Sequence, residues 1–138
     1  MNNLDALVLT FDCGTQSIRA LLFDKDGNIL AKEQKSFTPY YSLKPGYTEQ
    51  KPEVYVDALK EVSLNIHKNN PALIERIKAV TITTIRDTCL CLDETGKPIR
   101  DIIVWLDQRQ AKCEKPMPLV SNLAFTVAGM KEAIDDQR

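Results

Sequence analysis

Short apolar runs open the chain and predict three strands joined by tight turns. Residues 6–11 form a nearly continuous apolar run of strand length, and residues 18–23 form a second one. The following Asp26-Gly27 pair is a strong hairpin signal, because glycine readily takes the positive φ angles of tight turns. Residues 28–37 are expected to form a third strand. Three strands joined by two short turns predict an antiparallel meander.

A helical pattern follows a loop that is rich in tyrosine. Residues 38–50 contain two prolines, one glycine and three tyrosines, and are expected to form a loop anchored by its aromatic rings. Pro52 and Glu53 suit the first turn of a helix. Apolar residues then recur at helical spacing and should face the sheet; they are Tyr55, Leu59, Val62 and Ile66. The pattern ends before Pro71.

The second half of the chain predicts further strands and one more helix. Residues 77–83 are apolar enough for a central strand, and we expect this strand to lie parallel to the first. Residues 88–93 are expected to form another strand, turned back at residues 94–96. A short apolar stretch covers residues 102–105. Beyond Pro118, the spacing of apolar residues predicts a helix; they are Leu119, Leu123 and Val127.

This order of elements predicts an α/β fold of the ribonuclease H-like, or actin-like ATPase, class. Such a unit has a mixed sheet with an antiparallel three-strand meander and flanking helices. The first helix crosses over to bring the fourth strand beside the first. The unit normally closes with a second helix and a fifth strand, and no convincing fifth strand precedes Arg138. We therefore expect an incomplete domain.

Composition and charge narrow the possible partners. The chain is 43% apolar and 27% charged, with a formal net charge of −1, which is ordinary for a globular protein and argues against nucleic-acid and membrane partners. No apolar run is long enough to span a bilayer, and no signal peptide opens the chain. The four cysteines form no C-x-x-C pair, which argues against a zinc site and predicts reduced thiols in the cytoplasm.

The turn between the first two predicted strands carries the sharpest candidate chemistry. Its sequence is Asp12-Cys-Gly-Thr-Gln-Ser17. Backbone N–H groups at a strand end, a glycine that permits close approach and three polar side chains together favour an anion such as phosphate. Asp12 can hold a water of a hard cation such as magnesium, and Arg19 adds positive charge nearby. The alternative is an ordinary hairpin with an Asx-type turn.

Two further groups of residues follow later strands. Arg86 and Asp87 should emerge at the same sheet edge as Asp12, where one donates to and the other accepts from polyol hydroxyls. The alternative is a surface ion pair. Trp105 can form an apolar wall for the carbon face of a sugar, and Asp107 lies at an expected helix start. The alternative makes Trp105 a core residue and Asp107 a helix N-cap.

These motifs together resemble the N-terminal part of the FGGY carbohydrate kinases, the group of glycerol, xylulose and gluconate kinases. The resemblance covers residues 6 to about 110, in the order of the family. It rests on Asp12-x-Gly-Thr-x-Ser17 with Arg19, Gly46-Tyr-Thr-Glu-Gln50-x-Pro52, Arg86-Asp-Thr88, and Gly96-x-Pro-Ile-Arg100 running to Val104-Trp-x-Asp-x-Arg109. It implies a kinase that transfers the γ-phosphoryl group of ATP to a sugar or polyol hydroxyl, with Mg²⁺.

The resemblance also implies a role for each matching residue. Asp12 would act at magnesium, Arg19 would lie near the transferred group, and the residues of the turn would line the β- and γ-phosphates; they are Gly14, Thr15, Gln16 and Ser17. Arg86, Asp87 and Trp105 would contact the substrate. Ile85 stands where the family commonly has glutamine, and Asp87 where glycerol kinases have glutamate, so the substrate stays open.

The family's catalytic base and second domain would lie downstream of residue 138. We therefore expect residues 1–138 to be the N-terminal portion of an N-terminal kinase domain, inactive alone and prone to form a homo-oligomer. The alternative is a non-catalytic actin-like protein that binds nucleotide. A third possibility is a domain that binds a protein partner through Tyr40, Tyr41 and Tyr47.

Overall fold

A computed structural model describes residues 6–110 and 117–132. It divides into two compact units, Met1–Asp107 and Gln108–Arg138. The first unit contains a larger and a smaller β-sheet with their helices, and the second contains a short helix. In the described part of the chain, no helix has the length and apolar character needed to cross a membrane.

The antiparallel meander predicted from the apolar runs is confirmed. Strand β1 (Leu7–Cys13) pairs antiparallel with β2 (Ser17–Phe23), and β2 pairs antiparallel with β3 (Ile29–Ser36). The hairpin between β2 and β3 has Gly27 at φ 83°, and the Asp24 carboxylate accepts hydrogen bonds from the backbone amides of Asp26 and Asn28.

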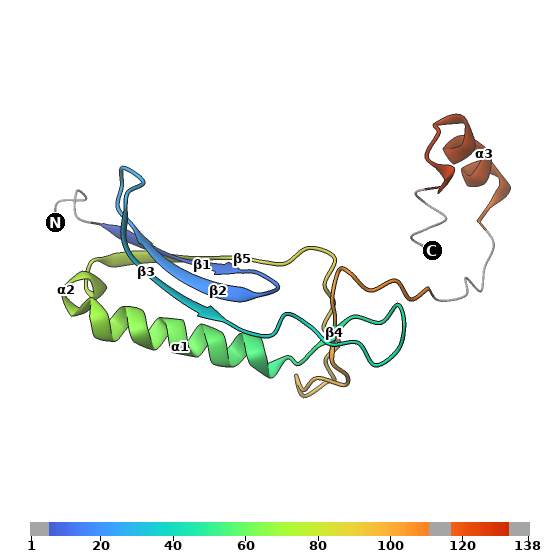
Figure 1. Cartoon of the computed structure of the whole chain (residues 1–138). Coiled ribbons are helices and arrows are strands. Elements are labelled where there is room, and N and C mark those ends of the chain that lie inside the picture. Colours follow the sequence, from blue (N-terminus) through green and yellow to red (C-terminus); the bar gives the residue numbers. More distant parts are fainter. Residues whose placement is uncertain (1–5, 111–116, 133–138) are drawn as a thin grey trace. The chain divides into compact units, whose positions relative to one another are not determined.

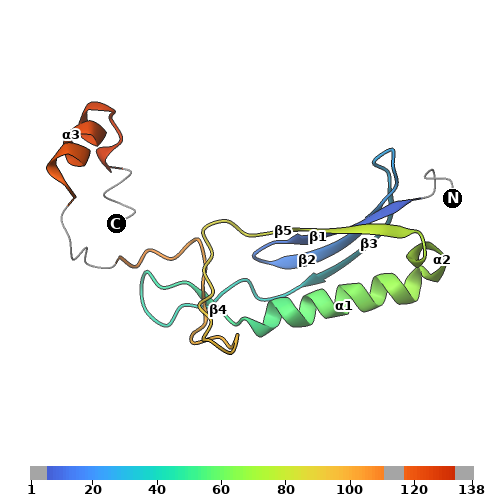
Figure 2. The same cartoon turned by 180° about the vertical axis from the view of Figure 1, so that it is seen from behind.

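Helix α1 (Glu53–Asn69) lies along one face of this sheet (Figures 1 and 2). Its apolar stripe faces the sheet as predicted, with Val62 and Ile66 each 1% exposed and packed against Ile18, Ala20 and Leu22 of β2. Tyr55 and Leu59 pack at the margin of the same core. A short helix, α2 (Pro71–Ile74), follows and leads into the next strand.

Strand β5 (Ile77–Thr83) runs parallel to β1, as expected, but it is not central. The sheet order is β3-β2-β1-β5, so β5 is an edge strand among the described residues. Ile82 pairs with Phe11 and therefore shares the face that α1 covers, yet Ile82 is 53% exposed. The apolar side chains of β5 are suited to burial, but α1 does not extend across the sheet far enough to cover them.

The prediction that residues 88–93 form a strand is also wrong. This segment makes only isolated bridges, Cys89 to Ile103 and Leu92 to Pro98. The second sheet instead pairs β4 (Glu49–Gln50) with β6 (Ile102–Ile103). Residues 94–96 do turn the chain back, because the amide of Asp93 donates to the carbonyl of Lys97.

The helix predicted beyond Pro118 is confirmed as α3 (Leu119–Val127), the helix of the second unit. Its predicted apolar residues are exposed within that unit, with Leu119 at 86% and Val127 at 81%. The expectation of self-association stays a prediction.

Candidate functional site

Asp12 lies at the carboxyl end of β1 between two polar side chains from neighbouring strands. It pairs in register with Arg19 of β2 and with Thr83 of β5. One Asp12 carboxylate oxygen lies 2.7 Å from Nη1 of Arg19, and the other accepts a hydrogen bond from the Thr83 hydroxyl at 3.1 Å. The three side chains share the sheet face opposite α1, because alternate residues of a strand face opposite sides. Arg19 therefore compensates the charge of Asp12 directly.

The turn from Gly14 to Ser17 is tight and exposes polar groups. The amide of Gly14 donates to the carbonyl of Ser17 at 3.0 Å, and Phe37 donates to the carbonyl of Gln16. Within residues 6–110, the amides of Thr15 and Gln16 have no protein acceptor. A Cβ at Gly14 would meet only the carbonyl of Ser17, at 3.4 Å. The packing of the chain itself therefore does not require glycine there.

The Gln50 side chain supports this turn through a hydrogen bond to the carbonyl of Thr15, a role that the sequence alone did not predict. Its side chain is buried, at 2% exposure. Its amide nitrogen donates to the carbonyls of Thr15 at 3.2 Å and Thr38 at 3.1 Å, and its oxygen accepts from the Tyr55 hydroxyl. The only sequence signal for Gln50 was its place in the family-like stretch from Gly46 to Pro52.

Burial, with a smaller contribution from Cys13, raises the pKa of Tyr55 to about 12. The Tyr55 hydroxyl therefore keeps its proton at neutral pH and remains a donor to Gln50. The contacts of Gln50 thus tie the phosphate-loop candidate to the first turns of α1.

Replacing Gln50 by leucine should destabilise the chain by about 1–3 kcal/mol, because two carbonyls and one hydroxyl would lose a buried partner. Urea unfolding of the Gln50→Leu variant measures this loss. The matched control is Gln34→Leu, since Gln34 is exposed on β3 and makes a single side-chain contact, with Arg19. Equal unfolding midpoints for the two variants would show that Gln50 does not support the turn.

Asp107 does not cap a helix, so the N-cap prediction is wrong. Residues 107–110 are not helical, and the Asp107 carboxylate accepts a hydrogen bond from the backbone amide of Thr48 at 2.7 Å. The amide of Val104 in turn donates to the carbonyl of Thr48. Asp107 therefore anchors the segment that carries Trp105 to Thr48, the residue just before Glu49.

Arg86 and Asp87 follow the carboxyl end of β5, the edge at which β1 also ends. Asp87 has φ 53°, and it is the one non-glycine residue with positive φ in the described part of the chain. Such residues tend to occur at functional sites. The two side chains line a hollow of about 260 Å³ together with Ile85 and Trp105. Neither forms an ion pair within residues 6–110 and 117–132, so the surface-pair alternative is not supported.

Trp105 connects this hollow to the turn after β1. It is 54% exposed and so is not the core residue of the alternative interpretation. Its ring nitrogen donates to the Thr15 hydroxyl at 3.2 Å. Trp105 also lines a second hollow, of about 370 Å³, whose other lining residues include Gly14, Gln16, Ser17 and Arg19. The candidate phosphate-binding residues and the candidate substrate residues therefore lie on either side of one tryptophan.

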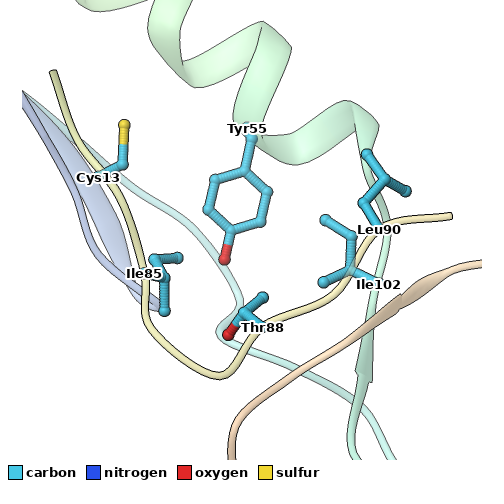
Figure 3. A pocket seen from close by; sticks show the side chains of 6 residues that line it. All are labelled: Cys13, Tyr55, Ile85, Thr88, Leu90 and Ile102. Carbon is cyan, nitrogen blue, oxygen red and sulfur yellow. The ribbon is translucent and has the colours of Figure 1, made fainter. Parts of the chain in front are cut away.

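Ile85 also lines a third, smaller pocket of about 200 Å³ (Figure 3). Tyr55 reaches down from α1, with Cys13 and Ile85 on one side and Leu90 and Ile102 on the other. Burial, reinforced by the nearby Asp12 carboxylate, raises the pKa of the Cys13 thiol. The pocket is therefore lined by protonated, weakly polar groups and offers no charge for a phosphate.

The oxygen donors at Asp12 fit a hydrated magnesium ion. No group of three or more potential metal ligands occurs in the described ranges, so the protein alone forms no closed metal cage. Magnesium usually keeps several waters and binds through one or two carboxylates plus substrate phosphates. A half-exposed carboxylate beside a turn with free amides suits that type of binding.

Comparisons with known proteins agree with this geometry. Residues 7–120 match the FGGY family of carbohydrate kinases, N-terminal domain. The chain is 39% identical over 112 residues to glycerol kinase of Mycoplasma capricolum subsp. capricolum, covering 80% of this chain and 22% of that protein. It is 43% identical over 108 residues to glycerol kinase 2 of Sulfolobus acidocaldarius, with 75% and 21% covered.

Solved structures show the same fold. The glycerol kinase of Plasmodium falciparum with ADP superposes with a TM-score of 0.60 at 25% identity, covering 90% of this chain and 23% of that one. A xylulose kinase from Rhodospirillum rubrum gives a TM-score of 0.68 at 22% identity, with 89% and 23% covered. The chain thus spans about one fifth of the length of these relatives. On the match over residues 7–120, the chain belongs to the FGGY family of carbohydrate kinases and lies in its N-terminal domain.

Proposed function

We propose that residues 1–138 are the N-terminal portion of the first domain of an ATP-dependent kinase that phosphorylates a sugar or polyol hydroxyl. In this proposal the catalytic base, the adenine site and the second domain are supplied by sequence outside this chain. The chain itself contributes the phosphate-binding turn and part of the substrate wall. It acts in the cytoplasm on a small molecule.

One observation carries the proposal, which is the position of Trp105 between the two hollows. Trp105 donates to Thr15 of the turn and lines the Arg86–Asp87 hollow with its exposed ring. Phosphoryl transfer depends mainly on placing the donor phosphate beside the acceptor hydroxyl. A phosphate site and a hydroxyl site that share one lining residue provide that arrangement.

On the phosphate side, the amides of Thr15 and Gln16 and the hydroxyl of Ser17 would bind the β- and γ-phosphates, while Gly14 leaves room for their approach. Arg19 would add positive charge near the transferred group. Asp12 would hold waters of the Mg²⁺ ion. When bound, that ion neutralises charge on the phosphates.

On the substrate side, Arg86 would donate hydrogen bonds to hydroxyls and Asp87 would accept them. Their lack of a mutual ion pair leaves both groups available for a ligand. The exposed face of Trp105 would pack against the carbon face of the substrate. A compound with two adjacent hydroxyls suits this hollow better than a charged or purely apolar one.

The direct test is a phosphorylation screen of the full-length protein against polyols, ketoses and aldonates, with ADP release as the measurement. We expect ATP turnover that depends on one of these compounds. ATP hydrolysis that no sugar or polyol stimulates would contradict the proposal and favour a non-catalytic actin-like protein.

The 138-residue chain alone should release no ADP in response to any sugar or polyol. Asp12 is engaged by Arg19 and Thr83, and the proposal places the base elsewhere. A coupled ADP-release assay on the purified chain, run beside the full-length protein, measures this difference. Sugar-dependent turnover by the chain itself would overturn the assignment of the catalytic base to the absent part.

A further inference from the structure

Tyr40 lines the hollow around the phosphate-binding turn, and none of the roles proposed above uses its side chain. This hollow of about 370 Å³ is bounded by the turn itself, by Arg19, by Trp105 with Leu106, and by Tyr40. Its lining residues within 6–110 include one arginine and no acidic residue. Because Asp12 already compensates the charge of Arg19, neutral hydrogen-bond donors on the wall add to the attraction of the hollow for an anion.

The hydroxyl of Tyr40 is a donor without a protein partner. Tyr40 is 40% exposed, and in the described ranges, residues 6–110 and 117–132, no hydrogen bond involves its hydroxyl. By contrast, the hydroxyl of Tyr41 donates to Asp101, and that of Tyr55 donates to Gln50. Tyr40 can therefore donate to a ligand in the hollow without first breaking a hydrogen bond within the protein.

Contacts on both sides of Tyr40 fix its backbone beside the turn. On one side, the amide of Phe37 donates to the carbonyl of Gln16 at 3.0 Å. On the other side, Tyr41 and Glu49 exchange both backbone hydrogen bonds, at 2.8 and 2.9 Å. The backbone that carries Tyr40 is thus held in place before any ligand binds, which lowers the entropic cost of using its side chain.

We propose that Tyr40 is a further phosphate-binding residue, whose hydroxyl donates a hydrogen bond to the β- or γ-phosphate of the nucleotide at the turn. This inference rests on the proposed function of the turn. A phenolic hydroxyl is a donor, and hydrogen bonds to a charged phosphate oxygen are shorter and stronger than neutral ones. The amides of Thr15 and Gln16 approach the phosphates from the turn, and Tyr40 adds a donor from a second segment of the chain.

Titration calorimetry of the full-length protein with Mg²⁺ and either a non-hydrolysable ATP analogue or AMP tests this role. Tyr40→Phe removes the hydroxyl and keeps the ring. We expect this variant to raise Kd for the analogue by about 10- to 100-fold, the loss typical of a hydrogen bond to a charged group. Kd for AMP should stay unchanged, because AMP has neither a β- nor a γ-phosphate. A purely structural role of the hydroxyl would weaken both ligands alike.

Tyr41→Phe is the matched control from the same loop. The Tyr41 hydroxyl donates to Asp101, and Tyr41 lines neither of the hollows that Trp105 borders, so this variant should bind the analogue as the unmodified protein does. An unchanged Kd in Tyr40→Phe, or an equal increase in Tyr41→Phe, would overturn the role of Tyr40 and leave the proposed kinase function standing. An unmodified protein that binds the analogue no more tightly than AMP would contradict the phosphate site itself, and both proposals with it.

Discussion

Replacing Asp12 by alanine in the full-length protein should lower kcat by about a hundredfold or more. The Asp12 carboxylate lies just before the turn and 2.7 Å from the Arg19 guanidinium, so its loss removes a proposed magnesium contact and the carboxylate that compensates the charge of Arg19. Electrostatic placement of metal and charge dominates phosphoryl transfer. Steady-state kinetics with saturating ATP and sugar measure the effect.

Two variants separate charge from structure in this experiment. Asp12→Asn keeps the shape and should lose nearly as much activity. Asp26→Ala, in the exposed β2–β3 hairpin, removes a carboxylate paired with Lys25 and should leave kcat unchanged. The Asp12 side chain is 42% exposed, so its ion pair contributes about 0–1 kcal/mol to stability and the variant should fold. Unchanged turnover in Asp12→Ala would refute the role of the turn.

Replacing Arg86 by alanine should raise KM for the sugar by about 10- to 100-fold, which corresponds to the loss of a charge-assisted hydrogen bond. KM for ATP should change little, because Arg86 lines the hollow next to Trp105 and not the hollow around the turn. Initial rates with each substrate varied in turn measure the two constants separately.

Arg100→Ala is the matched arginine control. Arg100 forms an ion pair with Glu49 at 2.8 Å and lines neither hollow, so its variant should change neither KM. Arg86→Lys keeps the charge but loses the planar donor fork, and should recover only part of the affinity. Equal increases in KM for sugar and ATP in Arg86→Ala would show that Arg86 supports the structure instead of contacting the sugar.

Local patterns were sufficient to predict most of the first unit. The apolar runs predicted β1 and β2, Asp26-Gly27 predicted the hairpin, and the spacing of Val62 and Ile66 predicted the buried side of α1. Each of these features depends on residues near one another in sequence, whose periodicity reflects which side chains are buried. The parallel pairing of β5 with β1 followed from the crossover helix between them.

The sequence did not predict the tertiary contacts of the later segments or the position of β5 in the sheet. An apolar pattern indicates that one face of a strand is buried, but it does not indicate the position of the strand in the sheet, so it could not place β5 at the edge. The same kind of pattern led to the wrong prediction of a strand around Cys89, where the chain forms only isolated bridges. The sequence predicted that Asp107 lies at the start of a helix. In the structure its carboxylate instead accepts a hydrogen bond from the amide of Thr48, 59 residues away. The residue type at one position does not reveal a hydrogen-bond partner that is so distant in sequence.

The candidate site shows the same division. The sequence by itself determined which residue types could bind phosphate and hydroxyls, because Asp12, Gly14 and Arg86 have few chemical alternatives in such motifs. The tertiary structure decided that Trp105 lies against Thr15, 90 residues earlier, and that buried Gln50 supports the turn. Both contacts depend on how β4, β6 and the loops between them pack. That packing is set by the whole chain and by no local pattern.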